Sequence, residues 1–266
     1  MASLKERLKV AAWFLRRPAY HAEFVRYTTR RLRSIGLDRS AQMREATALC
    51  ESVCVEPDAA ILAVTGRPPR GTVRELFPDE LARADAALRE APSAMHGAGN
   101  LELIYYLTEH VAATSAIETG VSAGWSSLAF LLSMRTRSGS KLVSTDMPYP
   151  GGARDAERSV GCVVLPELRP QWQCIVAPDH DALPAALAIL PELDICHYDS
   201  DKSYEGRMWA YPKLWHTLRS GGFFLSDDID DNFAFFHFCA EVDRRPVVVR
   251  MAASKRPKYV GIAVKP

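Results

Sequence analysis

The stretch that decides the fold is residues 118–124, Glu118-Thr119-Gly120-Val121-Ser122-Ala123-Gly124. It follows a strand-like run at 115–118 and precedes an apolar run at 125–134 that has the length of a helix. A strand, a glycine-containing loop and a helix form the beginning of an α/β unit. Ligands of such units bind beyond the carboxyl end of the strand. Gly120 and Gly124 would let the backbone turn tightly against a ligand there.

Strand and helix patterns alternate on both sides of this loop. Further strands are expected at 141–145, 173–177, 194–199, 222–227, 247–249 and 259–264, and further helices at 101–112, 181–190, 204–219 and 232–241. Strands separated by helices favour a mainly parallel sheet covered on both faces. The last two strands are joined only by residues 252–258, too few for a crossover helix, so we expect them to pair antiparallel. The predicted class is α/β, with a Rossmann-like, mainly parallel sheet.

The residues before this sheet predict a helical extension. Leu4, Leu8, Ala11 and Leu15 recur at helical spacing, and similar patterns occur at 20–35 and 79–90. We therefore divide the chain into an extension, residues 1–96, and a ligand-binding domain, residues 97–266. The extension could cover the active site, form a homodimer contact, or do both. A homodimer is the expected assembly.

The composition argues against several classes of partner. The chain has 33 Lys plus Arg and 32 Asp plus Glu, so its net charge favours neither nucleic acid nor membrane. Residues 1–35 are an exception, with nine Lys or Arg and two Glu. A solvated helix face is the preferred interpretation of this skew, and contact with a membrane surface or an acidic partner is the alternative. No basic stripe with interleaved aromatic residues, as in nucleic-acid enzymes, occurs in the core.

The expected location is the cytoplasm. No apolar stretch reaches the ~18 residues of a membrane span, so stable membrane insertion is not expected. The short apolar run 10–15 is followed by Arg16-Arg17-Pro18 rather than by a cleavage site. The six cysteines include no CxxC pair, which is typical of buried, reduced thiols.

The loop at 118–124 differs from a dinucleotide-binding loop in its first residue. A dinucleotide fold would carry G-x-G-x-x-G here, to place backbone amides against a pyrophosphate. Glu118 would repel a pyrophosphate but would attract the ammonium group of an aminoacyl cofactor. Ser126 and Ser127 begin the next helix, where hydroxyls and free amides could bind the carboxylate of that cofactor.

Asp146 is the second candidate for cofactor binding. It ends the next strand, 22 residues after Gly124, where a carboxylate can accept both ribose hydroxyls of a nucleotide. The alternative for Glu118 and Asp146 is that both are ordinary turn residues at strand ends.

Two later strand ends are rich in acids. Asp199 follows one strand, and the pair Asp227-Asp228 follows its neighbour in sequence. Neighbouring strands lie about 5 Å apart, so these carboxylates should converge and repel one another unless a cation lies between them. Hard oxygen ligands without nearby cysteine favour Mg²⁺, with Mn²⁺ or Ca²⁺ as alternatives. Asp230 and Asp231 are expected to cap helices and face water.

Residues 100–266 resemble the class I S-adenosylmethionine-dependent methyltransferase family, on the loop, on Asp146 and on the antiparallel terminal pair. The resemblance implies a seven-stranded sheet with an antiparallel last strand and S-adenosylmethionine as the cofactor. It places the segment 177–184 on the adenine, with Asp179 nearest. Ser122 stands where many members of the family have glycine.

The segment D-S-D-K-S-Y at 199–204 resembles the D-A-D-K-x-N-Y signature of metal-dependent catechol and caffeoyl-coenzyme A O-methyltransferases. That resemblance implies metal ligands at Asp199, Asp227 and Asp228 and a general base at Lys202. The Asp-Asp ending is instead similar to sugar O-methyltransferases of macrolide pathways. The longer Y-D-S-D-K-S-Y-E-G is similar to the D-G-D-H-S-Y-E-G of bacterial relatives near polysaccharide genes, which carry His in place of Lys202.

These features predict a metal-dependent O-methyltransferase that acts on a small hydroxylated acceptor, with a sugar preferred over a phenol or catechol. A non-catalytic cofactor-binding assembly partner is the alternative from another class. A divalent cation on the acceptor would lower the pKa of its hydroxyl, and Lys202 would take the proton. His180 is the second candidate for the base. His197, within a strand pattern, is expected to be a hydrogen-bonded core residue.

Overall fold

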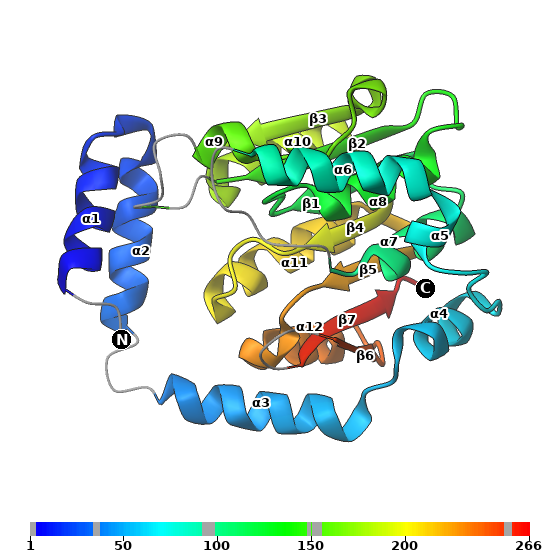
Figure 1. Cartoon of the computed structure of the whole chain (residues 1–266). Coiled ribbons are helices and arrows are strands. Elements are labelled where there is room, and N and C mark those ends of the chain that lie inside the picture. Colours follow the sequence, from blue (N-terminus) through cyan, green and yellow to red (C-terminus); the bar gives the residue numbers. More distant parts are fainter. Residues whose placement is uncertain (1–3, 34–37, 92–98, 148–149, 151–155, 253–256) are drawn as a thin grey trace.

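The computed structural model describes the whole chain except residues 1–3, 34–37, 92–98, 148–149, 151–155 and 253–256 (Figure 1). It contains a seven-stranded sheet in the order β3-β2-β1-β4-β5-β7-β6. The strands are β1 (Ser115–Thr119), β2 (Lys141–Asp146), β3 (Trp172–Val176), β4 (Leu193–Tyr198), β5 (Leu218–Ser226), β6 (Val247–Met251) and β7 (Lys258–Val264). The first five run parallel, and β7 pairs antiparallel with both β5 and β6. The predicted sheet and its antiparallel last strand are confirmed.

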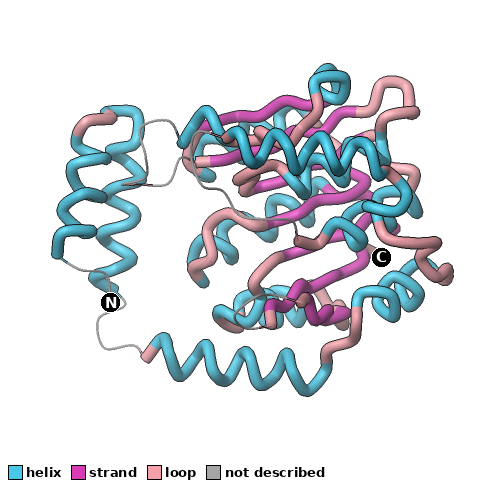
Figure 2. Tube along the Cα trace, in the orientation of Figure 1, coloured by secondary structure: helices cyan, strands magenta, loops and turns pink. Residues whose placement is uncertain are grey.

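Helices cover both faces of the sheet (Figure 2). The helices between or after strands are α8 (Trp125–Met134), α9 (Ala156–Ser159), α10 (Asp179–Ile189), α11 (Tyr204–Thr217) and α12 (Ala234–Glu241), and α7 (Leu101–His110) precedes β1. The described part of the chain before α7 is helical: α1 (Leu4–Leu15), α2 (His21–Arg33), α3 (Arg39–Val53), α4 (Pro57–Thr65), α5 (Val73–Leu76) and α6 (Pro78–Glu90). Short 3₁₀ turns are η1 (Pro18–Tyr20), η2 (Pro166–Gln171) and η3 (Ile229–Asp231). The last two residues of the helix expected at 20–35 lie outside the described residues.

Helices α3 and α4 were not predicted, because their apolar residues show no clear helical period. Their ends nevertheless carry ordinary capping signals. The side chain of Asp38 accepts a hydrogen bond from the backbone N–H of Ala41 at the start of α3. Pro57 is the first residue of α4, and Gly66 ends that helix in the left-handed conformation.

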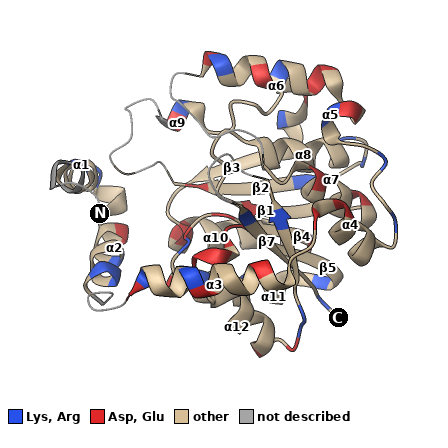
Figure 3. Cartoon of the chain, turned by 60° about the horizontal axis from the view of Figure 1, so that its bottom comes forward, with Lys and Arg blue, Asp and Glu red and all other residues tan. Residues whose placement is uncertain are grey.

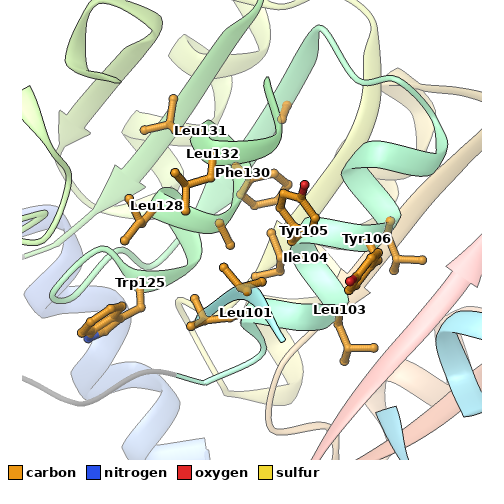
Figure 4. Close-up of a cluster of buried hydrophobic side chains, with 14 of the residues drawn as sticks. Leu101, Leu103, Ile104, Tyr105, Tyr106, Trp125, Leu128, Phe130, Leu131 and Leu132 are labelled. Carbon is orange, nitrogen blue, oxygen red and sulfur yellow. The ribbon is translucent and has the colours of Figure 1, made fainter. Parts of the chain in front are cut away.

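The core lies on both faces of the sheet, since side chains alternate between faces along each strand. One face packs against α7 and α8, as Figure 4 shows for Ile104 and Tyr105 of α7 beside Phe130 of α8. Ile61 of α4 and Leu81 of α6 belong to the same buried cluster. The other face packs against α10, α11 and α12. The helices at 57–90 thus share the core of the sheet, and the boundary at 96/97 stays a prediction.

The helices α1 and α2 form a hairpin beside the carboxyl edge of the parallel strands (Figure 1). Phe14 of α1 packs on Phe24 of α2, with ring centroids 5.0 Å apart. Arg30 of α2 forms an ion pair with Asp201 and donates a 3.1 Å hydrogen bond to the Ser203 hydroxyl. The hairpin therefore binds, through Arg30, to the segment that follows β4.

Charged residues on the other outer helices are of both signs, as Figure 3 shows for α3 and α6. No helix within the described residues is long and apolar enough to cross a bilayer.

Candidate active site

The loop after β1 takes a path that requires left-handed backbone at three positions. The φ angles are 83° at Gly120, 50° at Ser122 and 95° at Gly124. Ser122 thus adopts the conformation that glycine adopts at low cost, which explains why many similar loops have glycine there. A Cβ added to Gly120 would lie 2.4 Å from the backbone oxygen of Asp199. The loop after β1 therefore packs directly on the segment after β4.

Glu118 lies in the interior of the sheet rather than at its surface. The side chain is fully buried, and Oε2 accepts hydrogen bonds from the hydroxyls of Ser127 and Ser144. Its other oxygen, Oε1, lies 3.9 Å from Nδ1 of His197 and accepts no hydrogen bond from any described residue. Ser127, expected on the cofactor, here fixes Glu118, whereas Ser126 is only half-buried in the first turn of α8.

Asp146 holds the loop from the neighbouring strand. Its Oδ2 accepts a 3.0 Å hydrogen bond from the backbone N–H of Ser122. Burial disfavours the charged form and raises the pKa of Asp146 to about 6, although backbone N–H groups of Ser122, Met147 and Val121 partly offset that effect. The structure thus brings Glu118, Asp146 and the two loop glycines together around one turn.

Asp179 and His180 begin α10, beside the same edge of the sheet. Asp179 accepts a 2.5 Å hydrogen bond from the Ser200 hydroxyl, and burial raises its pKa. The ring of His180 stacks on Trp209, with centroids 4.0 Å apart. Burial, and then the charge of Arg26, lowers the pKa of His180. His180 thus stacks on Trp209 and lies within the electrostatic influence of Arg26 on α2.

The acids after β4 and β5 meet around a lysine. The pairing of Tyr198 with Ser226 places the next residues, Asp199 and Asp227, at adjacent strand ends. The ammonium of Lys202 lies 3.0 Å from Oδ1 of Asp199 and forms a closer ion pair with Asp228. Lys258 of β7 lies 3.0 Å from Asp228 as well. The acidic cluster, defined here as Asp199, Asp227 and Asp228, is thus neutralised in part by lysines.

Asp227 is held by different partners. Its Oδ1 accepts a hydrogen bond from the side-chain amide of Asn100 and lies 3.2 Å from Nε2 of His197. The fully buried Arg207 donates hydrogen bonds to the backbone oxygens of Asp227 and Asp228, at 3.0 and 2.8 Å. Asp228 needs this support because its φ of 49° is unusual for a residue with a side chain.

Burial and these ion pairs shift the pKa values of the residues in and around the acidic cluster. Burial raises the pKa of Asp199 to about 7, and the charge of Asp227 adds to that rise. Burial opposes the charge of Lys202, but Asp199 and Asp228 outweigh it and raise the pKa of the lysine. A lysine that acts as a base needs a lowered pKa, so in this ion-paired arrangement the shift is in the opposite direction. Among the described residues, no group of three or more His, Cys, Asp or Glu side chains converges as a metal site.

One expectation about the nearby acids is wrong. Asp230 does not face water but is fully buried, with Thr47 of α3 3.5 Å from its Oδ2. The cause is α3, which lies against the turn η3 and which the sequence did not predict. Asp231 is half-buried in the same turn.

Sequence reasoning missed the roles of Asn100, His197, Arg207 and Lys258 in this site. His197 offered a signal, because it lies two residues before Asp199 and so shares its face of the strand. Asn100 and Lys258 come from opposite ends of the domain and reach the cluster only through the fold. Nothing in their local sequence distinguishes them from other polar residues.

The sheet order, the antiparallel last strand and the loop after β1 define a Rossmann-like methyltransferase fold. Consistent with this class, residues 117–229 match a family model described as "Methyltransferase domain". No curated protein matches the chain.

Solved structures share the fold at low sequence identity. The O-methyltransferase from Bacillus cereus in complex with SAH is 14% identical, with a TM-score of 0.53 over 81% of this chain and 100% of that chain. TomG from Streptomyces achromogenes, an O-methyltransferase involved in tomaymycin synthesis and solved with SAM, is 16% identical. Its TM-score is 0.53, and the match covers 71% of this chain and 90% of that chain. The cofactor-bound Rv0187 from MTB is 17% identical, with a TM-score of 0.54, and the match covers 74% of this chain and 98% of that chain. At these identities the likeness establishes the fold.

Proposed function

We propose that this chain is an S-adenosylmethionine-dependent O-methyltransferase of small hydroxylated molecules. The methyltransferase-domain match and the fold support the reaction class. The observation that carries the proposal is the direct packing of Gly120 on the backbone of Asp199. It puts the loop expected to bind the cofactor beside the acids expected to hold the cation that contacts the acceptor, as transfer between two ligands requires.

The proposed cofactor site is formed by the loop after β1 and the end of β2. Asp146 would accept the ribose hydroxyls, and the half-buried Ser126 with the amides at the start of α8 would bind the carboxylate of the methionine moiety. Glu118 supports the loop from the interior of the sheet, and Ser127 and Ser144 fix the orientation of its carboxylate. Gly120, Ser122 and Gly124 would let the backbone approach the cofactor, and Asp179 would lie near the adenine.

We also propose that Asp199, Asp227 and Asp228 hold a divalent cation, Mg²⁺ or Mn²⁺. The donor set fits a hard cation, because its ligands are carboxylate oxygens at adjacent strand ends. The position of Lys202 fits as well, since its ammonium already lies between Asp199 and Asp228. Binding requires Asp199 and Asp228 to turn away from their present lysine partners, toward the second oxygen of Asp227. The bound cation would lower the pKa of the acceptor hydroxyl.

The chain's own residues have distinct tasks in the proposed reaction. The acceptor oxygen forms a bond to the methyl carbon while the carbon–sulfur bond of the sulfonium breaks, and the hydroxyl proton must leave. Lys202 is the proposed acceptor of that proton at Nζ, which requires the pull of Asp199 and Asp228 on its ammonium to be relieved. His180 is the second candidate. Arg207 keeps the backbone of Asp227 and Asp228 in place during the reaction.

The proposed acceptor is a vicinal diol, with a sugar preferred to a catechol. Two adjacent hydroxyls could both reach the region between the cofactor loop and the acidic cluster. The Asp-Asp pair at 227–228 and the Y-D-S-D-K-S-Y-E-G segment at 198–206 support the sugar. A phenolic acceptor and a non-catalytic role in assembly are the alternatives.

A homodimer through the α1–α2 hairpin completes the proposal. The outer face of the hairpin carries Leu8, Leu15, Val25 and Leu32, each more than 60% exposed. Apolar side chains this exposed, repeated seven residues apart on both helices, favour a covered surface. Residues 1–96 would then act both as a dimer contact and, through Arg30 and Asp201, as a cover for the active site.

The experiment that tests the function is transfer of a radiolabelled methyl group from S-adenosylmethionine to a panel of sugars and catechols. Transfer to a sugar diol that stops with a chelator and returns with Mg²⁺ would support the reaction, the sugar acceptor and the metal dependence. Transfer that a chelator leaves unchanged would contradict the metal site but not the methyltransferase. No transfer to any acceptor, with S-adenosylmethionine bound, would favour the non-catalytic role.

A further inference from the structure

His197 occupies an unusual position in the centre of the sheet. It lies on β4 directly opposite Glu118 of β1, and its side chain is almost completely buried. One ring nitrogen, Nδ1, faces Oε1 of Glu118 at 3.9 Å. The other, Nε2, faces Oδ1 of Asp227 at 3.2 Å. A single imidazole thus stands between two carboxylates that come from different strands.

Packing alone does not account for a histidine here. The neighbouring residues of β4 that line the core, Ile195 and Cys196, are apolar or weakly polar. A buried polar ring destabilises the fold unless its nitrogens have partners. Asp227 supplies that partner for Nε2. Nδ1 lies 3.9 Å from Oε1 of Glu118, which is too far for a hydrogen bond, and neither atom has a hydrogen-bond partner among the described residues. The ring is nevertheless close enough for an electrostatic contact with the one oxygen of Glu118 that Ser127 and Ser144 do not bind.

The two carboxylates belong to the two halves of the proposed site. Glu118 lies beneath the loop that would bind the cofactor, and Asp227 belongs to the acidic cluster. With Asn100 and His197 both on Oδ1, the second oxygen of Asp227 is left for another ligand. The orientation of each carboxylate therefore depends on the same imidazole.

We propose that His197 is a positioning residue that orients Glu118 through an electrostatic contact at Nδ1 and Asp227 through a hydrogen bond at Nε2, and so organises the cofactor half and the cation half of the site together. This inference rests on the proposed function. It assigns His197 no contact with either ligand, and its effects pass through the two carboxylates.

Three substitutions separate the two contacts. His197→Leu removes both of them. His197→Asn keeps an amide near the place of Nδ1, and His197→Gln keeps one near the place of Nε2. Calorimetry on the full chain would measure binding of S-adenosylhomocysteine and, separately, of Mn²⁺. We expect His197→Leu to weaken Mn²⁺ binding by roughly 10- to 100-fold, the value of a hydrogen bond to a charged group. Binding of S-adenosylhomocysteine should weaken by a smaller factor, because the contact with Glu118 is longer than a hydrogen bond. His197→Asn should recover S-adenosylhomocysteine binding only, and His197→Gln should recover Mn²⁺ binding only.

Cys196→Ala is the matched control, since Cys196 is a buried neighbour on β4 with its side chain on the other face of the sheet. It should lower the unfolding temperature and leave both affinities unchanged. Equal loss of both ligands in this control, or in all three His197 variants, would show a structural role only and overturn the inference. Normal binding of both ligands by His197→Leu would overturn it as well. Failure of the unsubstituted protein to bind either ligand would instead overturn the proposed function, and the inference with it.

Discussion

Gly120 packs directly on the backbone carbonyl of Asp199, so the loop after β1 and the acidic cluster are in contact. Two physical constraints act on this glycine. Its φ of 83° disfavours any side chain, and a Cβ would lie 2.4 Å from the carbonyl oxygen. Because of this contact, a larger side chain at position 120 would also displace the backbone of the acidic cluster.

Gly120→Ala should therefore destabilise the protein by about 2–5 kcal/mol, from about 1–2 for the left-handed backbone and about 1–3 for the steric overlap. Gly139→Ala is the matched control, since Gly139 has a φ of 74° but no atom within 4 Å of a Cβ. It should cost only the backbone part, about 1–2 kcal/mol. Denaturant unfolding measures both, and equal losses would show that the contact with Asp199 is unimportant.

The affinity for S-adenosylhomocysteine should depend on pH through Asp146. Its pKa is raised to about 6 by burial, so the carboxylate that would accept the ribose hydroxyls is mostly protonated at pH 5. Binding should weaken about tenfold from pH 7 to pH 5. Asp146→Asn should bind weakly with little pH dependence, and the same slope in this variant would contradict the assignment.

The stability of the unliganded protein should depend on Asp146 with the opposite sign. Because the folded-state pKa lies above the unfolded value, this group binds a proton more readily in the folded state. Its contribution is fully present below about pH 4 and is lost as the pH rises through about 6. Relative to Asp146→Asn, the unsubstituted protein should therefore gain stability as the pH falls from 7 to 5, measured by denaturant unfolding.

Lys202 and Asp227 should fail in different ways when they are substituted. Lys202→Ala should still bind the cofactor and Mn²⁺ but lose about 10²–10⁴-fold in turnover, the usual contribution of a positioned acid–base group. Its residual rate should rise with pH as the acceptor ionises unaided. Asp227→Ala should lose Mn²⁺ binding and turnover together, with partial recovery in excess Mg²⁺.

Asp231→Asn is the control for both, because it changes an acid of the same segment outside the cluster. Its turnover should be close to that of the unsubstituted protein. A normal rate in Lys202→Ala, together with a loss in His180→Ala, would transfer the role of base to His180.

The hairpin of α1 and α2 should form the homodimer contact. Light scattering should show a dimer that becomes a monomer when Leu8 and Leu15 are both changed to Asp. Val53→Asp, at an exposed position of α3, should leave the dimer intact. A monomer before any substitution would refute the dimer. Retention on vesicles of anionic lipid, lost in the double variant, would then indicate a membrane contact.

The sequence predicted the sheet well because burial on both faces leaves continuous apolar runs that end at polar turns. All seven strands and the antiparallel terminal pair could be located in this way. Helix α3 could not, because its residues are mostly polar and only Ala46 and Cys50 are buried. Its absence from the prediction also led to the error at Asp230.

The residues of the candidate site could be predicted where they lie at or just after the end of a strand. Asp146 ends one parallel strand, Asp199 and Asp227 follow two others, and such residues must gather at one edge of the sheet. Glu118 is the last residue but one of β1 and is buried. The lysine and amide partners of the acids could not be predicted, because Lys258 and Asn100 approach from distant parts of the chain. The pKa of Lys202 is raised by Asp199 and Asp228, and these close ion pairs also became visible only in three dimensions.

Calorimetric titration with S-adenosylhomocysteine is the decisive test of the cofactor site. We expect binding of one molecule per chain, and a loss of about 1.5–3 kcal/mol in Asp146→Ala, the value of a hydrogen bond to a charged group. Asp58→Ala, which removes an exposed acid of α4, should bind as the unsubstituted protein does. Tight binding of NAD with no response to S-adenosylhomocysteine would show that the chain is not an S-adenosylmethionine-dependent enzyme.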